Sequence, residues 1–213
     1  KIISNKRFKE NDGFANRKAN HGFPTYWHLE FEAGVIARNA HPGQFVNIKA
    51  GNGLDPLLRR PISIHGITGA RVKLFYEVIG KGTQVLSARK AGEFLDIIGP
   101  LGNGFDYPRT RAPAGQKAVV WPPLAKAAHP RTIIVAGGMG VAPLVFLAEK
   151  LVLGPAAQRP SVLIGARTKA GILCEKEFKK LGCDVKISTD DGSMGFKGKV
   201  TELLEEFLPA NPR

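Results

Sequence analysis

From about residue 26 to residue 98, apolar and polar positions alternate in short runs that turn residues separate. A period of two is typical of strands, because successive side chains of a strand point to opposite faces. Turn signals such as Pro42-Gly43, Gly66 and Gly69 bound these runs. The expected strands are 26–31, 43–48, 62–65, 71–78 and 93–98, with a short helix over 84–88. Strands at this spacing favour a small closed antiparallel β-barrel.

A second pattern begins at residue 132, where apolar runs alternate with segments of helical period. Strands are expected over 132–136, 161–166 and 185–189, and helices over 142–152, 174–181 and 200–207. This order predicts a doubly wound parallel α/β domain. Five prolines fall between residues 106 and 130. The fold class is therefore all-β followed by α/β, with domains over 1–105 and 132–213 and a proline-rich linker or insertion over 106–131.

Charge and composition narrow the class of partner. The 213 residues hold 31 Lys and Arg against 18 Asp and Glu, a net charge of +13 that favours anionic ligands. The basic residues are dispersed and lack interleaved aromatic residues, so we expect no nucleic acid but an anionic dinucleotide and an acidic protein partner. No apolar run approaches the roughly 20 residues of a membrane span, and no signal peptide is evident. We expect a cytoplasmic protein that does not enter a membrane.

Cysteines and histidines indicate neither a disulfide framework nor a metal site. The two cysteines, Cys174 and Cys183, lie nine positions apart, which is not a metal-ligand spacing. The five histidines show no metal-binding motif, and no nucleophile motif is present. We therefore expect no metal ligand and no catalytic side chain.

The run Arg60-Pro61-Ile62-Ser63 combines a cation and a hydroxyl on a stiff, extended segment. Pro61 biases Arg60 toward extended geometry. A guanidinium can clamp a pyrophosphate with two hydrogen bonds, and a serine hydroxyl can bond a ring nitrogen. Without further motifs, a basic loop leading into an edge strand explains the run equally well.

Two glycine turns precede predicted helices. In Gly80-Lys81-Gly82-Thr83 the amides of Gly82 and Thr83, with the Thr83 hydroxyl, can bind a pyrophosphate, although an ordinary helix cap is the alternative. The other turn joins the strand at 132–136 to the next helix, and its glycines let a phosphate approach the backbone. A plain structural turn is the alternative there. Its residues are Gly137, Gly138, Met139, Gly140, Val141, Ala142 and Pro143.

Asp190 follows the third strand of the α/β half, within Asp190-Asp191-Gly192-Ser193. Open parallel sheets bind ligands at the carboxyl ends of their strands, so Asp190 is a candidate ligand contact. A simple turn is the alternative.

Taken in this order, the motifs resemble the ferredoxin reductase superfamily, and within it the dihydroorotate dehydrogenase electron transfer subunits. The resemblance covers about residues 26–208. It is carried by Pro42-Gly43-Gln44-Phe45, Arg59-Arg60-Pro61-Ile62-Ser63, Tyr76-Glu77-Val78-Ile79-Gly80-Lys81-Gly82-Thr83, Gly99-Pro100-Leu101-Gly102, the 137–143 turn and Thr189-Asp190-Asp191-Gly192-Ser193.

The resemblance implies an FAD-binding barrel and an NAD-binding α/β domain. FAD would contact Arg60, Pro61, Ile62 and Ser63, lie beside Phe75, Tyr76 and Glu77, and place its phosphates on Gly82 and Thr83. NAD would lie on Gly137, Gly138, Met139, Gly140, Ala142 and Pro143, near Asp190. Electrons would pass from an FMN-containing, dihydroorotate-oxidising partner through a 2Fe-2S cluster to FAD and then NAD, in a heterotetramer. The cofactors would carry the redox chemistry.

Two departures from that family are visible. The insertion over 107–130 is longer than expected, and the sequence stops before the fourth strand and the four-cysteine loop of the 2Fe-2S cluster, so we expect a fragment. The strand at 132–136 would then be an exposed apolar edge.

Two alternative functions remain: a stand-alone NAD(P)H-dependent flavin or ferredoxin reductase, and a non-catalytic flavin-binding module. The choice between NAD and NADP is also open, because Arg167, at the end of the second strand, could meet the 2′-phosphate that only NADP carries.

Overall fold

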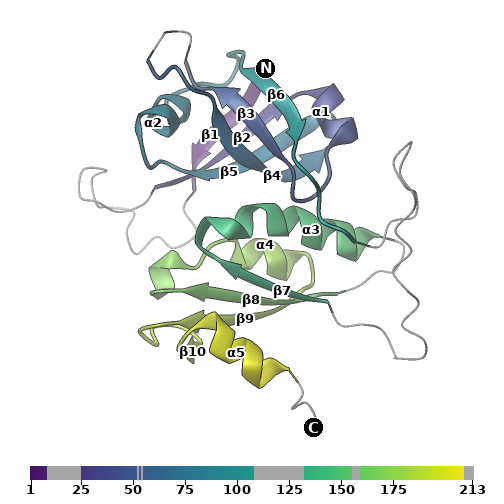
Figure 1. The fold of residues 1–213 in the computed structure, drawn as a ribbon, viewed down its shortest axis with the longest axis vertical. Coiled ribbons are helices and arrows are strands. Elements are labelled where there is room, and N and C mark those ends of the chain that lie inside the picture. Colours follow the sequence, from purple (N-terminus) through teal and green to yellow (C-terminus); the bar gives the residue numbers. More distant parts are fainter. Residues whose placement is uncertain (9–24, 52, 54, 108–131, 155–158, 209–213) are drawn as a thin grey trace. The chain divides into compact units, whose positions relative to one another are not determined.

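The computed structural model describes residues 1–8, 25–51, 53, 55–107, 132–154 and 159–208 (Figure 1). The chain divides into two compact units, one formed by 1–105 with 142–146 and the other by 106–141 with 147–213. Each unit has its own sheet. Nearly all of the predicted linker, residues 108–131, lies outside the described residues.

The first unit contains a six-stranded antiparallel sheet in the order β1-β2-β5-β4-β3-β6. The strands are β1 (Ile2–Arg7), β2 (Tyr26–Glu32), β3 (Phe45–Lys49), β4 (Arg60–Thr68), β5 (Arg71–Glu77) and β6 (Asp96–Leu101), and the helices are α1 (Gly34–Asn39) and α2 (Lys81–Ser87). The Ile2 amide donates to the Glu93 carbonyl (2.7 Å) and the Gly92 amide donates to the Ile2 carbonyl (2.9 Å). These bonds tie β1 to the segment before β6 and draw the ends of the sheet together. The predicted antiparallel barrel is confirmed.

Alternating apolar side chains build the core of this unit. Val72 and Leu74 on β5 and Val46 and Ile48 on β3 are fully buried. Each such side chain contributes about 1.5–3 kcal/mol of transfer free energy, so these strands are held by packing as well as by their ladders. The core therefore fixes the strand register and, with it, the direction in which every other side chain on these strands points.

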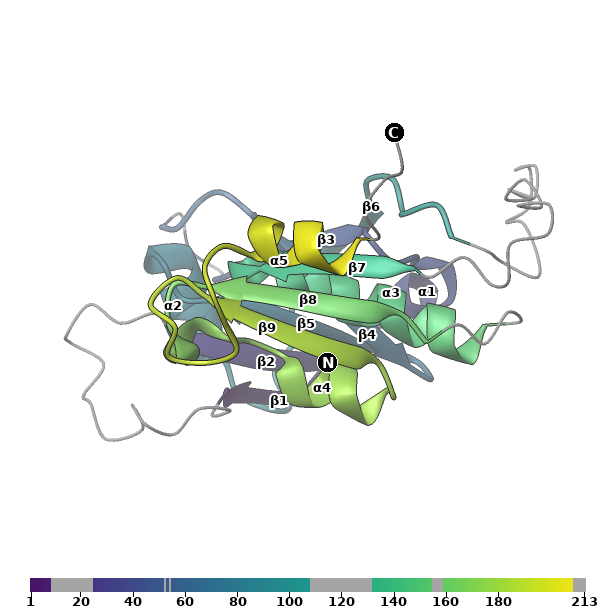
Figure 2. The same cartoon turned by 90° about the horizontal axis from the view of Figure 1, so that it is seen from below.

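The second unit contains a four-stranded parallel sheet in the order β10-β9-β8-β7. Its elements are β7 (Ile133–Gly137), α3 (Val141–Leu153), β8 (Ser161–Ala166), α4 (Glu175–Lys180), β9 (Asp184–Thr189), β10 (Phe196–Lys197) and α5 (Val200–Phe207), except that residues 142–146 of α3 group with the first unit. Figure 2 shows β7, β8 and β9 side by side, and Figure 1 shows α4 and α5 on opposite faces of the sheet. Helices on both faces confirm the predicted doubly wound α/β class.

The outer strands of this sheet differ from the central ones in exposure. Val162, Leu163 and Ile164 of β8 are all buried, as expected for a parallel strand covered on both faces. Within the described residues β7 pairs with β8 alone, and Val135 on β7 is 39% exposed. The predicted exposed apolar edge is therefore confirmed in this part of the chain. None of the described helices has the length and apolar character needed to cross a membrane.

Several element boundaries differ from the sequence-based expectation. β1 and α1 were not predicted, because each is short and lacks a clear period. α2 begins at Lys81 rather than at residue 84. β4 begins at Arg60, so the whole Arg60-Pro61-Ile62-Ser63 motif lies within a strand. β6 begins at Asp96 rather than at residue 93, because the segment before it turns to bond with Ile2.

Candidate functional site

The Arg60-Pro61-Ile62-Ser63 motif forms the beginning of β4, where it pairs with β3. Ile62 is only 7% exposed and belongs to the barrel core, whereas Pro61 is exposed and Ser63 is half-buried. Among the described residues the Ser63 hydroxyl has no hydrogen-bonding partner, so it can serve a ligand. The Ile62 side chain packs within the core, so a ligand could contact only the backbone of this residue.

The structure brings Arg60 against the first turn of α2. If Gly82 carried a Cβ atom, that atom would lie 2.5 Å from Cζ and 2.6 Å from Nη2 of Arg60. A side chain at residue 82 would therefore displace the guanidinium, and only glycine permits this approach. Arg60 and Gly82, two predicted ligand contacts on separate elements, are thus direct neighbours.

The charge of Arg60 is not neutralised by the described part of the chain. Its Nη1 donates to the carbonyls of Leu58 (2.7 Å) and Arg59 (3.3 Å), and no acidic side chain there pairs with it. Arg59 behaves differently, because its Nη2 lies 2.7 Å from Oδ2 of Asp96. The hydrogen bond from Arg59 lowers the pKa of Asp96. Of these adjacent arginines, Arg60 is the one that offers its charge to an anion.

Thr83 stabilises the start of α2 through its hydroxyl. Its Oγ1 accepts hydrogen bonds from the amides of Ile79 (3.1 Å) and Gly80 (3.3 Å) and donates to the Gly80 carbonyl (3.1 Å). The hydroxyl therefore acts as a helix cap. The first amides of any α-helix lack an intrahelical acceptor, so the amides of Gly82 and Thr83 remain suitable for an anion.

Phe75, Tyr76 and Glu77 end β5 with their side chains among protein neighbours. Phe75 is 1% exposed, and its ring centroid lies 4.7 Å from that of His28 and 5.0 Å from that of Phe8. Tyr76 is 3% exposed and donates to Oδ1 of Asn5 (3.2 Å). The buried side chains of Phe75 and Tyr76 belong to the protein interior, so a ligand beside this strand would meet its backbone.

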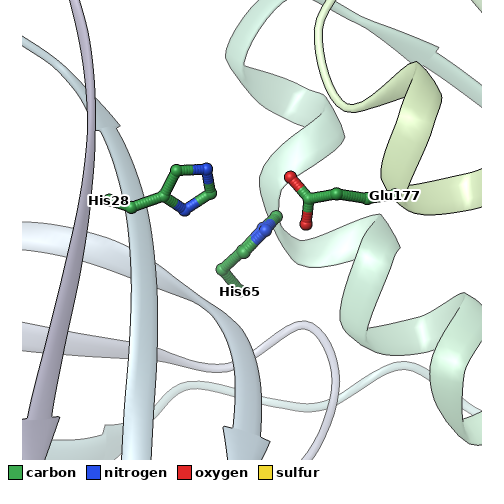
Figure 3. Close-up of side chains that lie close together, drawn as sticks. All are labelled: His28, His65 and Glu177. Carbon is green, nitrogen blue, oxygen red and sulfur yellow. The ribbon is translucent and has the colours of Figure 1, made fainter. Parts of the chain in front are cut away.

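Two histidines that are distant in the sequence come together in the barrel. The ring centroids of His28 on β2 and His65 on β4 lie 5.3 Å apart (Figure 3), and Nδ1 of His65 lies 2.8 Å from the Ala142 carbonyl oxygen. Glu177, also labelled in Figure 3, lies on α4 of the second unit. Strand pairing through β5 creates the histidine pair, which sequence spacing does not reveal.

The glycine turn of the second half lies between β7 and α3. β7 ends at Gly137, a short 3₁₀ turn covers Gly138–Gly140, and α3 begins at Val141. Gly138 has φ of 51°, a value that favours glycine. An added Cβ at Gly138 or Gly140 would meet no atom within 4 Å. The backbone is thus open to a phosphate at the N-terminus of a 13-residue helix.

The other predicted members of this turn are more enclosed. Met139 and Pro143 are half-buried, and Ala142 is 2% exposed. Pro143 lies in the first turn of α3, where its missing amide costs nothing. Ligand contacts at this turn would therefore come mainly from the glycine backbone.

Asp190 and Asp191 follow β9 but have different surroundings. The Asp190 amide donates to the Ala166 carbonyl (3.1 Å), and the residue is exposed. Oδ1 of Asp191 accepts from the Ser193 hydroxyl (2.6 Å) and amide (2.9 Å). The Ser193 hydroxyl also accepts from the Lys169 amide (2.7 Å) in the loop after β8. Asp191 thus orders the loop, while Asp190 is available to a ligand at the carboxyl end of the sheet.

Comparison with known proteins identifies relatives of this chain. No protein-family model matches the chain. A dihydroorotate dehydrogenase B (NAD(+)) electron transfer subunit from Desulforamulus reducens is 42% identical over 187 residues, which is 87% of this chain. The Bacillus cereus subunit of the same name is 37% identical over 183 residues, or 85% of this chain. The chain is homologous to these electron transfer subunits. It spans 64% and 63% of their respective lengths.

Solved structures agree on the fold. An NADH-dependent reduced ferredoxin-NADP oxidoreductase, studied for flavin-based electron bifurcation, superposes with a TM-score of 0.68 at 23% identity, covering 97% of this chain and 62% of its own. Ferredoxin-NADP⁺ reductase from Plasmodium falciparum superposes with a TM-score of 0.62 at 13% identity. The superposition covers 97% of this chain and 77% of the reductase chain. The chain therefore has the ferredoxin reductase fold. Like its electron transfer subunit homologues, these neighbours are oxidoreductases.

The Asp191–Ser193 hydrogen bonds yield a pH-dependent prediction. They lower the pKa of Asp191, so they stabilise the loop above the ordinary carboxyl pKa of about 4, and this contribution disappears as the pH falls through the lower folded-state value. Ser193→Ala should raise the pKa of Asp191 toward its ordinary value. Asp96 is the internal control, because its lowered pKa depends on Arg59. An NMR titration of the carboxyl carbons measures both, and an Asp191 that titrates identically in both proteins contradicts the assignment.

Proposed function

We propose that the chain is part of an electron transfer subunit that passes electrons between an FMN-containing, dihydroorotate-oxidising partner and NAD in pyrimidine biosynthesis. The supporting observation is the Arg60 guanidinium, which lies against Gly82 without an acidic partner among the described residues. The 42% identity to a named electron transfer subunit supplies the biological context.

The proposed FAD site belongs to a domain over residues 1–105. Arg60 would clamp the pyrophosphate, because a guanidinium can donate two parallel hydrogen bonds to it. The amides of Gly82 and Thr83 would add donors, and the Ser63 hydroxyl would bond a flavin ring nitrogen. FAD, when bound, supplies the electron-accepting chemistry. The remaining proposed contacts are backbone groups of Pro61, Ile62, Phe75, Tyr76 and Glu77.

The proposed NAD site belongs to a domain over residues 132–213. The open backbone at Gly138 and Gly140, directly after Gly137, suits a pyrophosphate, and the positive end of the α3 dipole favours it. The exposed Asp190 carboxylate can accept a hydrogen bond from a ribose hydroxyl. Met139, Ala142 and Pro143 complete the turn that holds these groups. The homologues are named for NAD(+), which favours NAD over NADP.

The 2Fe-2S cluster of the proposed electron route does not fit the residues of this chain. Such a cluster requires four protein ligands, usually cysteines. The chain has two cysteines, Cys174 and Cys183, and both are buried. Burial also raises the pKa of Cys183, which disfavours the thiolate that binds metal. We therefore derive no electron transfer step through a cluster held by this chain.

Arg60→Ala tests the FAD site most directly. Loss of a charge-assisted contact should weaken FAD binding by about 1.5–3 kcal/mol, or roughly 10- to 150-fold in Kd. Arg59→Ala is the matched control, since Arg59 pairs with Asp96 and should leave the Kd unchanged. Fluorescence titration with FAD measures both. If the wild type and Arg60→Ala bind FAD with equal affinity, Arg60 does not contact the cofactor.

Gly82→Ala separates the binding geometry from helix stability. Alanine should favour the helix by up to about 1 kcal/mol, yet its Cβ would displace the Arg60 guanidinium. We expect FAD affinity to fall at least tenfold, equivalent to about 1.4 kcal/mol, while the helix content by circular dichroism is retained. Gly80→Ala is the control, because a Cβ there meets no atom within 4 Å. Undiminished FAD binding by Gly82→Ala would exclude the proposed Arg60 geometry.

Affinity purification from the native organism tests the proposed partner. The expected result is a co-purifying subunit that contains FMN and oxidises dihydroorotate. The basic net charge of +13 predicts that the association weakens as salt rises. Full reductase activity of the isolated chain with a soluble acceptor would instead support the stand-alone reductase.

A further inference from the structure

Asn5 on β1 bonds the carboxyl end of α2, more than eighty positions away in the sequence. Its Nδ2 lies within hydrogen-bonding distance of the carbonyl oxygens of Leu86 (2.8 Å), Ser87 (3.3 Å) and Arg89 (3.0 Å). The last carbonyls of a helix lack intrahelical donors. One side-chain amide thus reaches the last two carbonyls of α2 and the Arg89 carbonyl just beyond the helix.

Tyr76 fixes the orientation of this amide. The Tyr76 hydroxyl donates to Oδ1 of Asn5 (3.2 Å), so the amide nitrogen must face the α2 carbonyls. Burial raises the pKa of Tyr76 above its ordinary value, which keeps the phenol protonated as a donor. Asn5 therefore has a defined rotamer that connects β5 to α2.

α2 is held at two ends by different contacts. At its carboxyl end Asn5 bonds the carbonyls, and at its beginning Gly82 lies against Arg60. The Leu86 side chain, near the carboxyl end of the helix, is fully buried in the barrel core. A helix of seven residues is about 10 Å long and has little stability of its own, so external contacts decide where it lies.

We propose that Asn5 is a positioning residue for flavin dinucleotide binding: it holds α2 so that the Arg60–Gly82 contact has the geometry that the FAD pyrophosphate requires. This inference rests on the proposed FAD site. Asn5 does not touch the proposed flavin contacts on β4, and it meets Tyr76 of β5 through the phenol hydroxyl, whereas the proposed contact of Tyr76 with FAD is its backbone. Its effect should therefore depend on the phosphate portion of the ligand.

Asn5→Asp tests this role with almost no change in shape. The carboxylate still accepts from Tyr76 but places an oxygen against the α2 carbonyls, where a donor is required. We expect the Kd for FAD to rise at least tenfold, or about 1.4 kcal/mol, and the Kd for riboflavin, which has no phosphate, to change less than about twofold. Ser4→Ala on the same strand is the control and should leave both values unchanged.

A merely structural role would give a different pattern. FAD and riboflavin would then weaken by the same factor, in parallel with a lower Tm of the flavin-free protein, and that result would overturn the proposal. Tyr76→Phe is the second variant, in case Asn5→Asp does not fold; it should weaken FAD selectively through the loss of amide orientation. If both variants bind FAD as the wild type does, Asn5 has no positioning role. Failure of the wild type itself to bind FAD would instead reject the proposed function.

Discussion

The structure of the candidate FAD site depends on one contact, the Arg60 guanidinium against the backbone of Gly82. Strand β4 supplies the cation and helix α2 supplies backbone amides, and glycine lets the two approach. No acidic group in the described residues compensates the charge. A cation held in place beside free amides attracts an anion more effectively than a mobile surface lysine, because its position is already determined before the ligand arrives. An anionic nucleotide is the ligand that this arrangement suits.

The two halves of the chain differ in the groups that their candidate sites offer to a ligand. In the barrel, a charged side chain and a hydroxyl on a strand provide the polar groups, and the proposed ligand has a pyrophosphate and a ring to match them. In the α/β unit, the open glycines at 138 and 140 and the dipole of α3 provide a less selective anion site, and Asp190 adds a carboxylate. One tightly held cofactor and one exchangeable nucleotide are consistent with this difference.

Local sequence patterns predicted the parts of the molecule that short-range physics determines. The alternation in β5, the apolar runs of β7 and β8 and the glycine before α3 all identified their elements correctly. The short strand β1 carries no comparable pattern, and its Asn5 contacts join residues more than eighty positions apart. The sequence also did not predict the roles of Ile62 and Thr83. Only the folded barrel shows that the Ile62 side chain fills the core and that the Thr83 hydroxyl caps a helix. Pairing through β5 likewise created the unpredicted contact between His28 and His65.

The most direct measurement is an equilibrium titration of the purified, flavin-free chain with FAD, followed by visible absorbance. If Arg60, Gly82 and Ser63 form a flavin nucleotide site, the chain binds a single equivalent of FAD and the flavin absorbance band shifts on binding. ADP, which retains the pyrophosphate, should compete for the same site. A chain that causes no shift of the flavin band at saturating FAD, or that binds FAD without competition by ADP, would contradict the assignment of these residues.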